Sequence, residues 1–166
     1  MDFETAVNYI FKFEGGYSND PKDPGGITNF GISLRAYPEL GADGIKSLTK
    51  EQAKEIYKRD YWDVCECDNL PEHLRLMTFD CAVNQGPSYA IRTLQRSIGA
   101  NPDGIVGPMT VMASVQTSKE VALYRFAFNR FSRYESNPNW DRFGVGWTSR
   151  LLAVTVESAI QEVPYL

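Results

Sequence analysis

Residues 14–33 read EGGYSNDPKDPGGITNFGIS and indicate more about the fold than any other stretch of this chain. Glu14 ends an N-terminal segment whose apolar residues recur at helical spacing, at Phe3, Val7, Ile10 and Phe11. Two glycines then stop the helix. The residues after them are rich in Gly, Pro, Asn and Asp, which predicts a loop, and residues 27–33 predict a short hairpin. The stretch therefore joins the end of a helix to a small β element.

Three carboxylates mark the same stretch, at Glu14, Asp20 and Asp23. The C-terminal end of a helix is negative and the neighbouring Phe11 and Phe13 exclude water, so Glu14 is expected to keep its proton near neutral pH. Asp20 and Asp23 lie in a polar loop, whose backbone N–H groups favour a charged carboxylate. One protonated and one charged carboxyl group are the pair that hydrolyses glycosidic bonds. A purely structural alternative stays open, because glutamates are common at helix ends and Asp-Pro pairs often start turns.

The rest of the chain is predicted to be mainly helical. Thr49 and Gln52 have the spacing of a capping box, which predicts a helix that starts at Lys50. Apolar periodicity, glycines and prolines predict helices at about residues 50–62, 71–86, 88–98, 118–134 and 139–162. Neither a repeat nor a long linker separates these segments. We expect a mainly α fold, with a small β element near the loop that carries the carboxylates.

The length and charge of the chain restrict its class. At 166 residues, the chain is long enough to bury roughly 70% of its unfolded surface without disulfides or metal, and 43% of its residues are hydrophobic. The net charge of −4 is uneven: residues 1–87 carry 9 basic and 15 acidic side chains, whereas residues 88–166 carry 8 and 6. Nucleic acid is therefore not an expected partner.

The cysteines do not predict a disulfide framework or a metal site. Cys65, Cys67 and Cys81 are odd in number, and the paired C-x-x-C spacing of zinc sites is missing. His73 is the single histidine. We expect buried, reduced thiols, no metal and no cofactor.

Membrane and export signals are also missing from the sequence. No apolar run approaches the roughly 18 residues of a transmembrane helix. The N-terminus, MDFE, is acidic and lacks the basic start of a signal peptide. We expect a protein that is made in the cytoplasm and has no stable association with a membrane.

The opening motif resembles a known enzyme family. Residues 14–17 (EGGY) and 23–32 (DPGGITNFGI) resemble the first motif of the glycoside hydrolase 108 family, which contains phage and bacterial N-acetylmuramidases with a lysozyme-like fold. The resemblance is strongest at residues 14–33 and extends more loosely over nearly the whole chain. It implies a lysozyme-like, mainly α fold with an α+β character at the catalytic loop.

The resemblance also implies roles for residues of the loop. The family's catalytic glutamate falls on Glu14. Phage lysozymes more widely use a Glu, an Asp and a Thr in that order, which places Asp23 and Thr28 in the site, although the interval between these two is one residue shorter than in the commonest phage lysozymes. Asp20 remains an alternative to Asp23. Substrate contacts are expected from Asp20 and from two further residues of the loop and hairpin, Tyr17 and Asn29.

A second motif lies in residues 79–87, FDCAVNQGP, at the end of a predicted helix. It resembles the family segment that borders the substrate cleft, and the amides of Asn84 and Gln85 suit N-acetyl and hydroxyl groups of a sugar. The alternative is that Asn, Gly and Pro only end the helix. Asp80 lies in the middle of the helix, where a buried hydrogen-bonding role is the competing interpretation.

The second half contains a third motif, NPDGIVGPMT at residues 101–110. It resembles a turn of helical peptidoglycan-binding modules, with Pro108 as the first residue of the next helix. The segment could equally pack two helices together and bind nothing. Arg130, Arg133 and Arg150 are candidates for contacts with anionic wall groups, or for ion pairs with acidic neighbours.

These expectations combine into one hypothesis. Residues 1–87 would form a lysozyme-like catalytic region and residues 88–166 a peptidoglycan-binding-like region, packed as one compact unit. The implied protein is a monomeric phage endolysin that cuts the bond between N-acetylmuramic acid and N-acetylglucosamine in bacterial peptidoglycan. It would wait in the host cytoplasm until lysis and act on the periplasmic wall. A lytic transglycosylase, a chitinase-type specificity and a wall-binding protein without activity remain alternatives.

Overall fold

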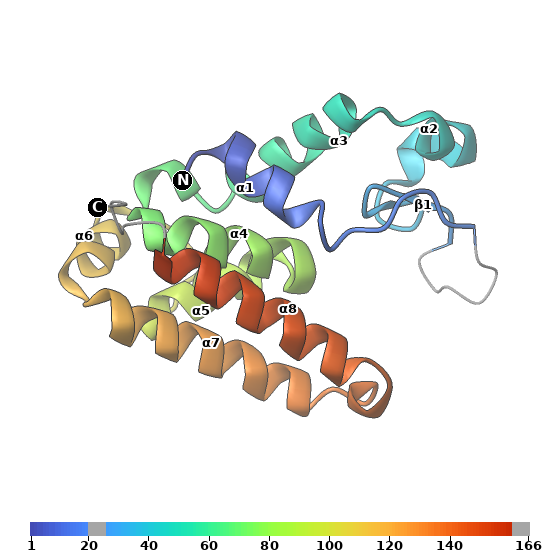
Figure 1. The fold of residues 1–166 in the computed structure, drawn as a ribbon. Helices are drawn as coiled ribbons and strands as arrows, with labels where there is room; N and C mark the ends of the chain where they lie inside the picture. The colour runs from blue at the N-terminus through green and yellow to red at the C-terminus, as the bar shows by residue number, and fades with distance from the viewer. Residues whose placement is uncertain (20–25, 161–166) are drawn as a thin grey trace. The chain divides into compact units, whose positions relative to one another are not determined.

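The structure is a computed structural model that describes residues 1–19 and 26–160 (Figure 1). Its contacts divide the chain into two compact units. Phe3–Arg59 form the first, here called the N-terminal unit, and Met1–Asp2 join Asp60 and the residues after it in the second, here called the helical unit.

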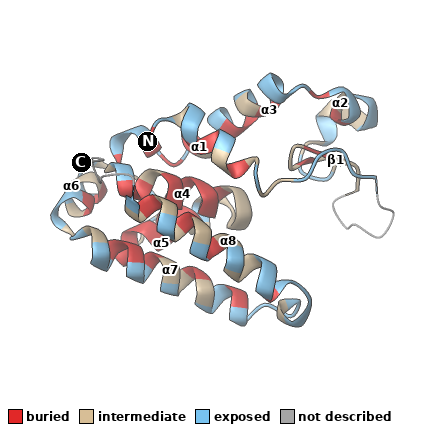
Figure 2. Cartoon of the chain, viewed as in Figure 1, coloured by how far each residue is buried: buried red, intermediate tan, exposed pale blue. Residues whose placement is uncertain are grey.

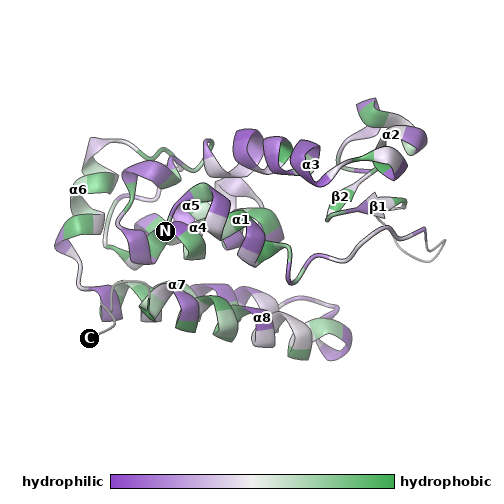
Figure 3. Cartoon of the chain, turned by 45° about the horizontal axis from the view of Figure 1, so that its top comes forward, coloured by the Kyte–Doolittle hydropathy of each residue, from purple (hydrophilic) through white to green (hydrophobic). Residues whose placement is uncertain are grey.

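Among its described residues, the N-terminal unit contains three short α-helices and a two-stranded sheet. Its elements are α1 (Phe3–Ile10), β1 (Thr28–Asn29), β2 (Ile32–Ser33), the 3₁₀ turn η1 (Pro38–Leu40), α2 (Gly41–Ser47) and α3 (Lys50–Tyr57). The buried core is mostly aliphatic and comes from α1, β2, α2 and α3, through Val7, Ile10, Ile32, Ile45 and Ile56, with Tyr57 as an aromatic member. Hydrophilic residues cover the rest of α3 (Figure 3).

The helical unit is an assembly of longer helices. After the π-helical turn η2 (Lys58–Trp62) and the 3₁₀ turn η3 (Cys67–Asn69) come α4 (Glu72–Gln85), α5 (Pro87–Ser97), α6 (Pro108–Gln116), α7 (Lys119–Glu135) and α8 (Trp140–Ile160). α4 packs against α5, α7 and α8, and most of its residues are buried (Figure 2). None of the helices within the described ranges has the length and apolar character needed to cross a membrane.

Most predicted elements are confirmed. The described residues are mainly α-helical with one small antiparallel sheet, and α7 and α8 lie within two residues of the predicted ranges. The capping box is present, since Gln52 N donates to Thr49 Oγ1 and Thr49 N donates to Gln52 Oε1.

Two helix ends differ from the prediction. α1 ends at Ile10, and the N–H groups of Lys12 and Phe13 donate to carbonyls three residues back instead of four. Glu14 therefore follows a tightened turn that the apolar periodicity did not reveal. α3 ends at Tyr57 and continues as the π-helical η2.

The boundary between the two compact units also differs from the boundary that the sequence predicted. The units separate between Arg59 and Asp60, so α4 groups with the later helices. The expected functional division at residues 87 and 88 stays a prediction.

Candidate functional site

The Glu14 carboxylate packs against the tip of the β1–β2 hairpin. β1 and β2 pair antiparallel, and the two residues between them, Phe30 and Gly31, have φ angles of 49° and 76°. Two positive φ values are typical of the type I′ turn, whose twist matches that of paired strands. A Cβ atom on Gly31 would lie 2.6 Å from Glu14 Oε2. Glycine therefore meets two requirements here: it adopts the positive φ, and it leaves room for the carboxylate.

Aromatic side chains hold this hairpin tip in place. The Phe11 ring lies 5.9 Å from the Phe30 ring and 5.5 Å from the Tyr57 ring, measured between centroids. The Tyr57 hydroxyl donates to the Phe30 carbonyl at 3.0 Å, and it is the other group that a Cβ on Gly31 would meet. Tyr57 thus joins Glu14 at the site, although it was not among the site residues expected from the sequence. A buried tyrosine hydroxyl needs a hydrogen-bond partner, and this requirement was the one indication in the sequence that Tyr57 would contact a polar group.

The same hairpin carries Thr28. Its backbone exchanges hydrogen bonds of 2.8 and 2.9 Å with Ser18, which brings the segment after Glu14 alongside β1. The Thr28 hydroxyl donates to the Gly26 carbonyl at 3.3 Å. Tyr17, next to Ser18, exposes 47% of its surface. Glu14, Tyr17 and Thr28 therefore all border one hairpin.

The structure places Asn29 in a supporting position. Its side chain is buried, and its amide nitrogen donates to the carbonyls of Ile45, Lys46 and Leu48 at 3.1, 3.4 and 3.4 Å. These carbonyls lie at the end of α2, where helix carbonyls are left without the usual intrahelical partners, although the Ile45 carbonyl also accepts from Leu48 N. The amide of Asn29 thus ties the hairpin to α2, and its expected contact with substrate stays a prediction. Asp20 and Asp23 lie outside the described residues, so both assignments also stay predictions.

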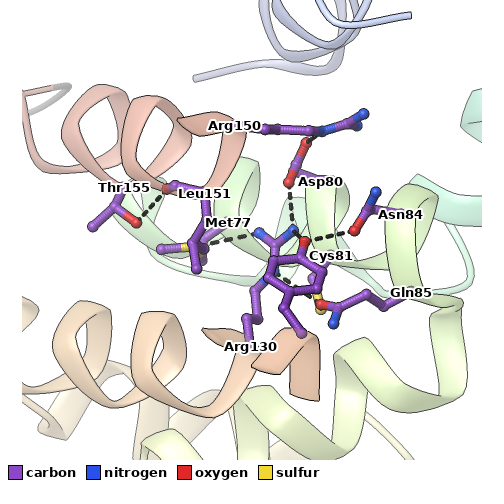
Figure 4. Close-up of polar contacts among 10 residues, drawn as sticks. Met77, Asp80, Cys81, Asn84, Gln85, Arg130, Arg150, Leu151 and Thr155 are labelled. Carbon is purple, nitrogen blue, oxygen red and sulfur yellow. Dashed lines mark hydrogen bonds and ion pairs between the residues drawn. The ribbon is translucent and has the colours of Figure 1, made fainter. Parts of the chain in front are cut away.

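A second group of predicted residues lies in the helical unit, at the end of α4 (Figure 4). Asp80 is fully buried and pairs with two arginines: Arg130 Nη2 lies 2.7 Å from Asp80 Oδ2, and Arg150 Nε lies 2.7 Å from Asp80 Oδ1. The structural interpretation of Asp80 is therefore confirmed. Of the two alternatives for Arg130 and Arg150, the ion pair with an acidic neighbour is the one observed.

Arg130 extends this network to the predicted amides. Burial is the largest single effect on the pKa of its guanidinium and lowers it, but Asp80, Cys81 and Tyr134 together outweigh burial and hold the pKa above its usual value. Arg130 Nε donates to Gln85 Oε1 at 3.0 Å, and Nη2 donates to the Tyr134 hydroxyl at 3.0 Å. That hydroxyl donates in turn to Asn84 Oδ1 at 2.5 Å. The sequence could not predict these partners, because the bonded residues lie 45 to 50 positions apart in the chain.

The motif at residues 101–110 is held in place by hydrogen bonds to the side chain of Gln95. The Gln95 amide, which is fully buried, donates to Asp103 Oδ1, the Ile105 carbonyl and Thr110 Oγ1, and its oxygen accepts from Gly104 N at 2.9 Å. Two polar side chains of the motif, those of Asp103 and Thr110, thus bind Gln95. This observation explains the motif as a link between α5 and α6 and supports the structural alternative.

The three cysteines are free and buried, as expected. Burial, together with the neighbouring Cys81, raises the pKa of Cys65 to about 12. Across residues 1–19 and 26–160, no three His, Cys, Asp or Glu side chains gather as they would around a metal ion.

Comparison with known proteins agrees with this fold and site. The glycosyl hydrolase 108 family model matches residues 7–86, which include Glu14, the hairpin and α4. The solved structure of Brucella abortus SagA matches with a TM-score of 0.88 and 33% sequence identity, and the match covers 99% of this chain and 98% of that chain. None of the curated proteins to which the chain was compared matches it. The chain belongs to the glycosyl hydrolase 108 family, and at the level of that family it is a glycoside hydrolase that degrades peptidoglycan.

Proposed function

We propose that the chain is an N-acetylmuramidase that hydrolyses the β-1,4 bond between N-acetylmuramic acid and N-acetylglucosamine, with Glu14 as the general acid. The observation that carries the proposal is the packing of the Glu14 carboxylate on Gly31, at the tip of the hairpin that also carries Thr28. A general acid must be held in one place relative to the leaving oxygen. The rigid turn and the Tyr57 hydroxyl beside it meet that requirement.

In the proposed mechanism, Glu14 donates its proton to the glycosidic oxygen as the bond to the muramic acid carbon breaks. Asp23 and Thr28 hold a water molecule on the opposite face of the sugar. The water attacks the same carbon and gives up its proton to Asp23, so the product is a reducing sugar with inverted configuration.

The test is digestion of purified peptidoglycan, followed by mass spectrometry of the soluble fragments. The wild type is expected to release fragments that end in reducing muramic acid, and Glu14→Gln is expected to release none while it keeps the wild-type melting temperature. Glu4→Gln is the matched control, because Glu4 is an exposed carboxylate of α1 that pairs with Lys54. It should retain full activity.

Other outcomes would contradict the proposal. Fragments lighter by one water would identify a lytic transglycosylase, and equal release by wild type and Glu14→Gln would remove Glu14 from the mechanism. No release by the wild type would favour a wall-binding protein. Cleavage of chitin at the same rate as peptidoglycan would indicate a chitinase-type specificity.

The biological setting is a separate proposal: a phage endolysin that stays in the host cytoplasm until the membrane is opened. The wall-degrading activity of the family is what such a role requires. Bacteria that express the chain should keep their turbidity until chloroform permeabilises the membrane and then clear. Clearing without chloroform would contradict the proposal.

A further inference from the structure

A polar pocket of about 220 Å³ lies in the helical unit, between the ends of α4 and α7 and the first half of α8. It is lined by Asn84, Gln85, Arg133, Tyr134, Asn137 and Trp147. Asn84 and Gln85 were expected from the sequence to meet substrate, and Arg133 was a candidate for contact with anionic wall groups. The volume is below the roughly 300–1,000 Å³ of pockets for drug-sized ligands, so it suits a single small chemical unit.

The buried hydrogen bonds of Arg130 and Tyr134 set the orientation of the side-chain amides of Asn84 and Gln85. Arg130 can only donate hydrogen bonds, so the Tyr134 hydroxyl accepts from Arg130, and it donates its own proton to Asn84 Oδ1. Asn84 therefore presents its oxygen to Tyr134 and keeps its NH₂ group for another partner. Gln85 likewise gives its oxygen to Arg130 Nε. Its nitrogen is buried and has no hydrogen-bond partner among the described residues.

The remaining polar groups of the pocket are also donors. Arg133 is exposed, and its guanidinium carbon lies 3.9 Å from the centre of the Tyr89 ring, which holds the charged group at the pocket. Asn137 gives its side-chain oxygen to the N–H of Asn139, so its NH₂ group remains. None of the six lining residues is acidic. The pocket thus offers the NH₂ groups of Asn84 and Asn137 and one positive charge, and the buried nitrogen of Gln85 lies in the same lining residue set.

An aromatic wall completes the pocket. The Trp147 ring stacks on the Tyr134 ring with centroids 5.3 Å apart and an angle of 28° between the planes. Tyr134 is buried while Trp147 is partly exposed, so the stack fixes an indole at the pocket. A flat apolar face beside convergent donors is suited to a sugar or a short peptide with acceptor groups on one side.

From these groups we infer that the pocket binds a carboxylate-bearing fragment of peptidoglycan. Its role would be to bind this fragment, whereas Glu14 would act on the glycosidic bond. A carboxylate accepts charge-assisted hydrogen bonds from Arg133 and the amides, and a neutral sugar offers no such charge. The excess of two positive charges in residues 88–166 favours an acidic ligand as well. The inference rests on the proposed peptidoglycan substrate, in which the carboxylate can come from the lactyl group of muramic acid or from the peptide stem.

Calorimetric titration of the full chain with three probes tests the inference. The probes are N-acetylmuramic acid, the dipeptide L-alanyl-D-glutamate and neutral N-acetylglucosamine. At least one acidic probe should bind about tenfold more tightly than N-acetylglucosamine. Tight binding of the muramic acid assigns the lactyl group, and tight binding of the dipeptide alone assigns the stem.

Variants connect the binding to the pocket. Arg133→Met removes the charge but keeps an aliphatic contact with Tyr89, and Asn84→Asp keeps the acceptor for Tyr134 but replaces the outward NH₂ by a negative oxygen. Both should reduce the acidic probe to the affinity of N-acetylglucosamine. Arg125→Met is the matched control, because Arg125 is an exposed arginine of the same helix outside the pocket, and it should keep the preference.

Equal affinity for all three probes, no binding of any probe, or an unchanged preference in Arg133→Met and Asn84→Asp would overturn the inference. These results are distinguishable from failure of the muramidase proposal, because the probes contain no glycosidic bond to cut. Release of reducing muramic acid by the wild type would still support the proposed reaction if the pocket proved empty. Melting temperatures of the variants verify that each is folded.

Discussion

Asp80 and Arg130 form a 2.7 Å ion pair in which both side chains are fully buried. The pair joins α4 to α7, and Arg150 brings α8 to the second oxygen of the same carboxylate. One carboxylate therefore ties three helices together. Through Arg130 it also orients the amides at the end of α4, so the shape of the pocket depends on a charge that the pocket does not expose.

Asp80→Asn should be strongly destabilising. The substitution keeps the size of the side chain but leaves the buried guanidinium of Arg130 without its counter-ion, which is expected to lower the free energy of unfolding by about 3–5 kcal/mol. Urea denaturation followed by circular dichroism measures the loss. The exposed carboxylate of α8, Asp141, supplies the control, and Asp141→Asn should stay within about 0.5 kcal/mol of the wild type. Equal urea midpoints for the two variants would show that the ion pair does not hold the helices.

The sequence predicted those parts of the fold that depend on local chemistry. α7 and α8 follow from apolar periodicity, the start of α3 from Thr49 and Gln52, and the hairpin from the composition of residues 27–33. α2 was not predicted, because GADGIKS is short and has two glycines and no clear apolar face. Local patterns give no signal for such a helix.

The candidate site was predictable only where a motif carries it. Glu14 and Thr28 were found because they stand in one contiguous stretch. The partners of Asp80 and Asn84 were not, since they come from α7 and α8, and a single sequence does not say which distant charges meet. Asn29 shows that a motif does not reveal every contact of its residues. Its place in the motif suggested a contact with substrate, and the motif gave no sign that its buried amide donates to the Ile45 carbonyl.

The thiols should be inert in the folded protein. Burial is the main cause that raises the pKa of both Cys65 and Cys81 to about 12, so almost no reactive thiolate is present near pH 8. Ellman's reagent should give no rapid colour with the native chain and should titrate all three cysteines in guanidinium chloride. A rapid reaction of even one thiol without denaturant would contradict the buried positions.

Asp103 should make the stability of the fold depend on pH. The backbone N–H of Ile105, and after it the Gln95 amide, hold the pKa of this carboxyl below its usual value of 3.8. The charged form thus stabilises the fold above that value, and the stabilisation is lost as pH falls through the lower, folded-state pKa. The wild type should melt above Asp103→Asn near neutral pH, and the difference should shrink as the pH falls below the usual value of 3.8. A difference that does not vary with pH would exclude Asp103 as its source; Asp141→Asn serves as the control.

Gly31→Ala should impair catalysis more than it impairs stability. The new methyl group would meet the Tyr57 hydroxyl and come within 2.6 Å of Glu14 Oε2, so the carboxylate must move. Displacement of a catalytic group by about 1 Å can reduce a rate about 100-fold, and the positive φ adds about 1–2 kcal/mol of backbone strain. Gly99→Ala isolates the strain, because Gly99 has a φ of 72° but nothing within 4 Å of an added Cβ. Both variants should lose similar stability in thermal melts, while only Gly31→Ala should release muropeptides far more slowly than the wild type. Full activity in Gly31→Ala would mean that the contact between Gly31 and Glu14 does not position the acid.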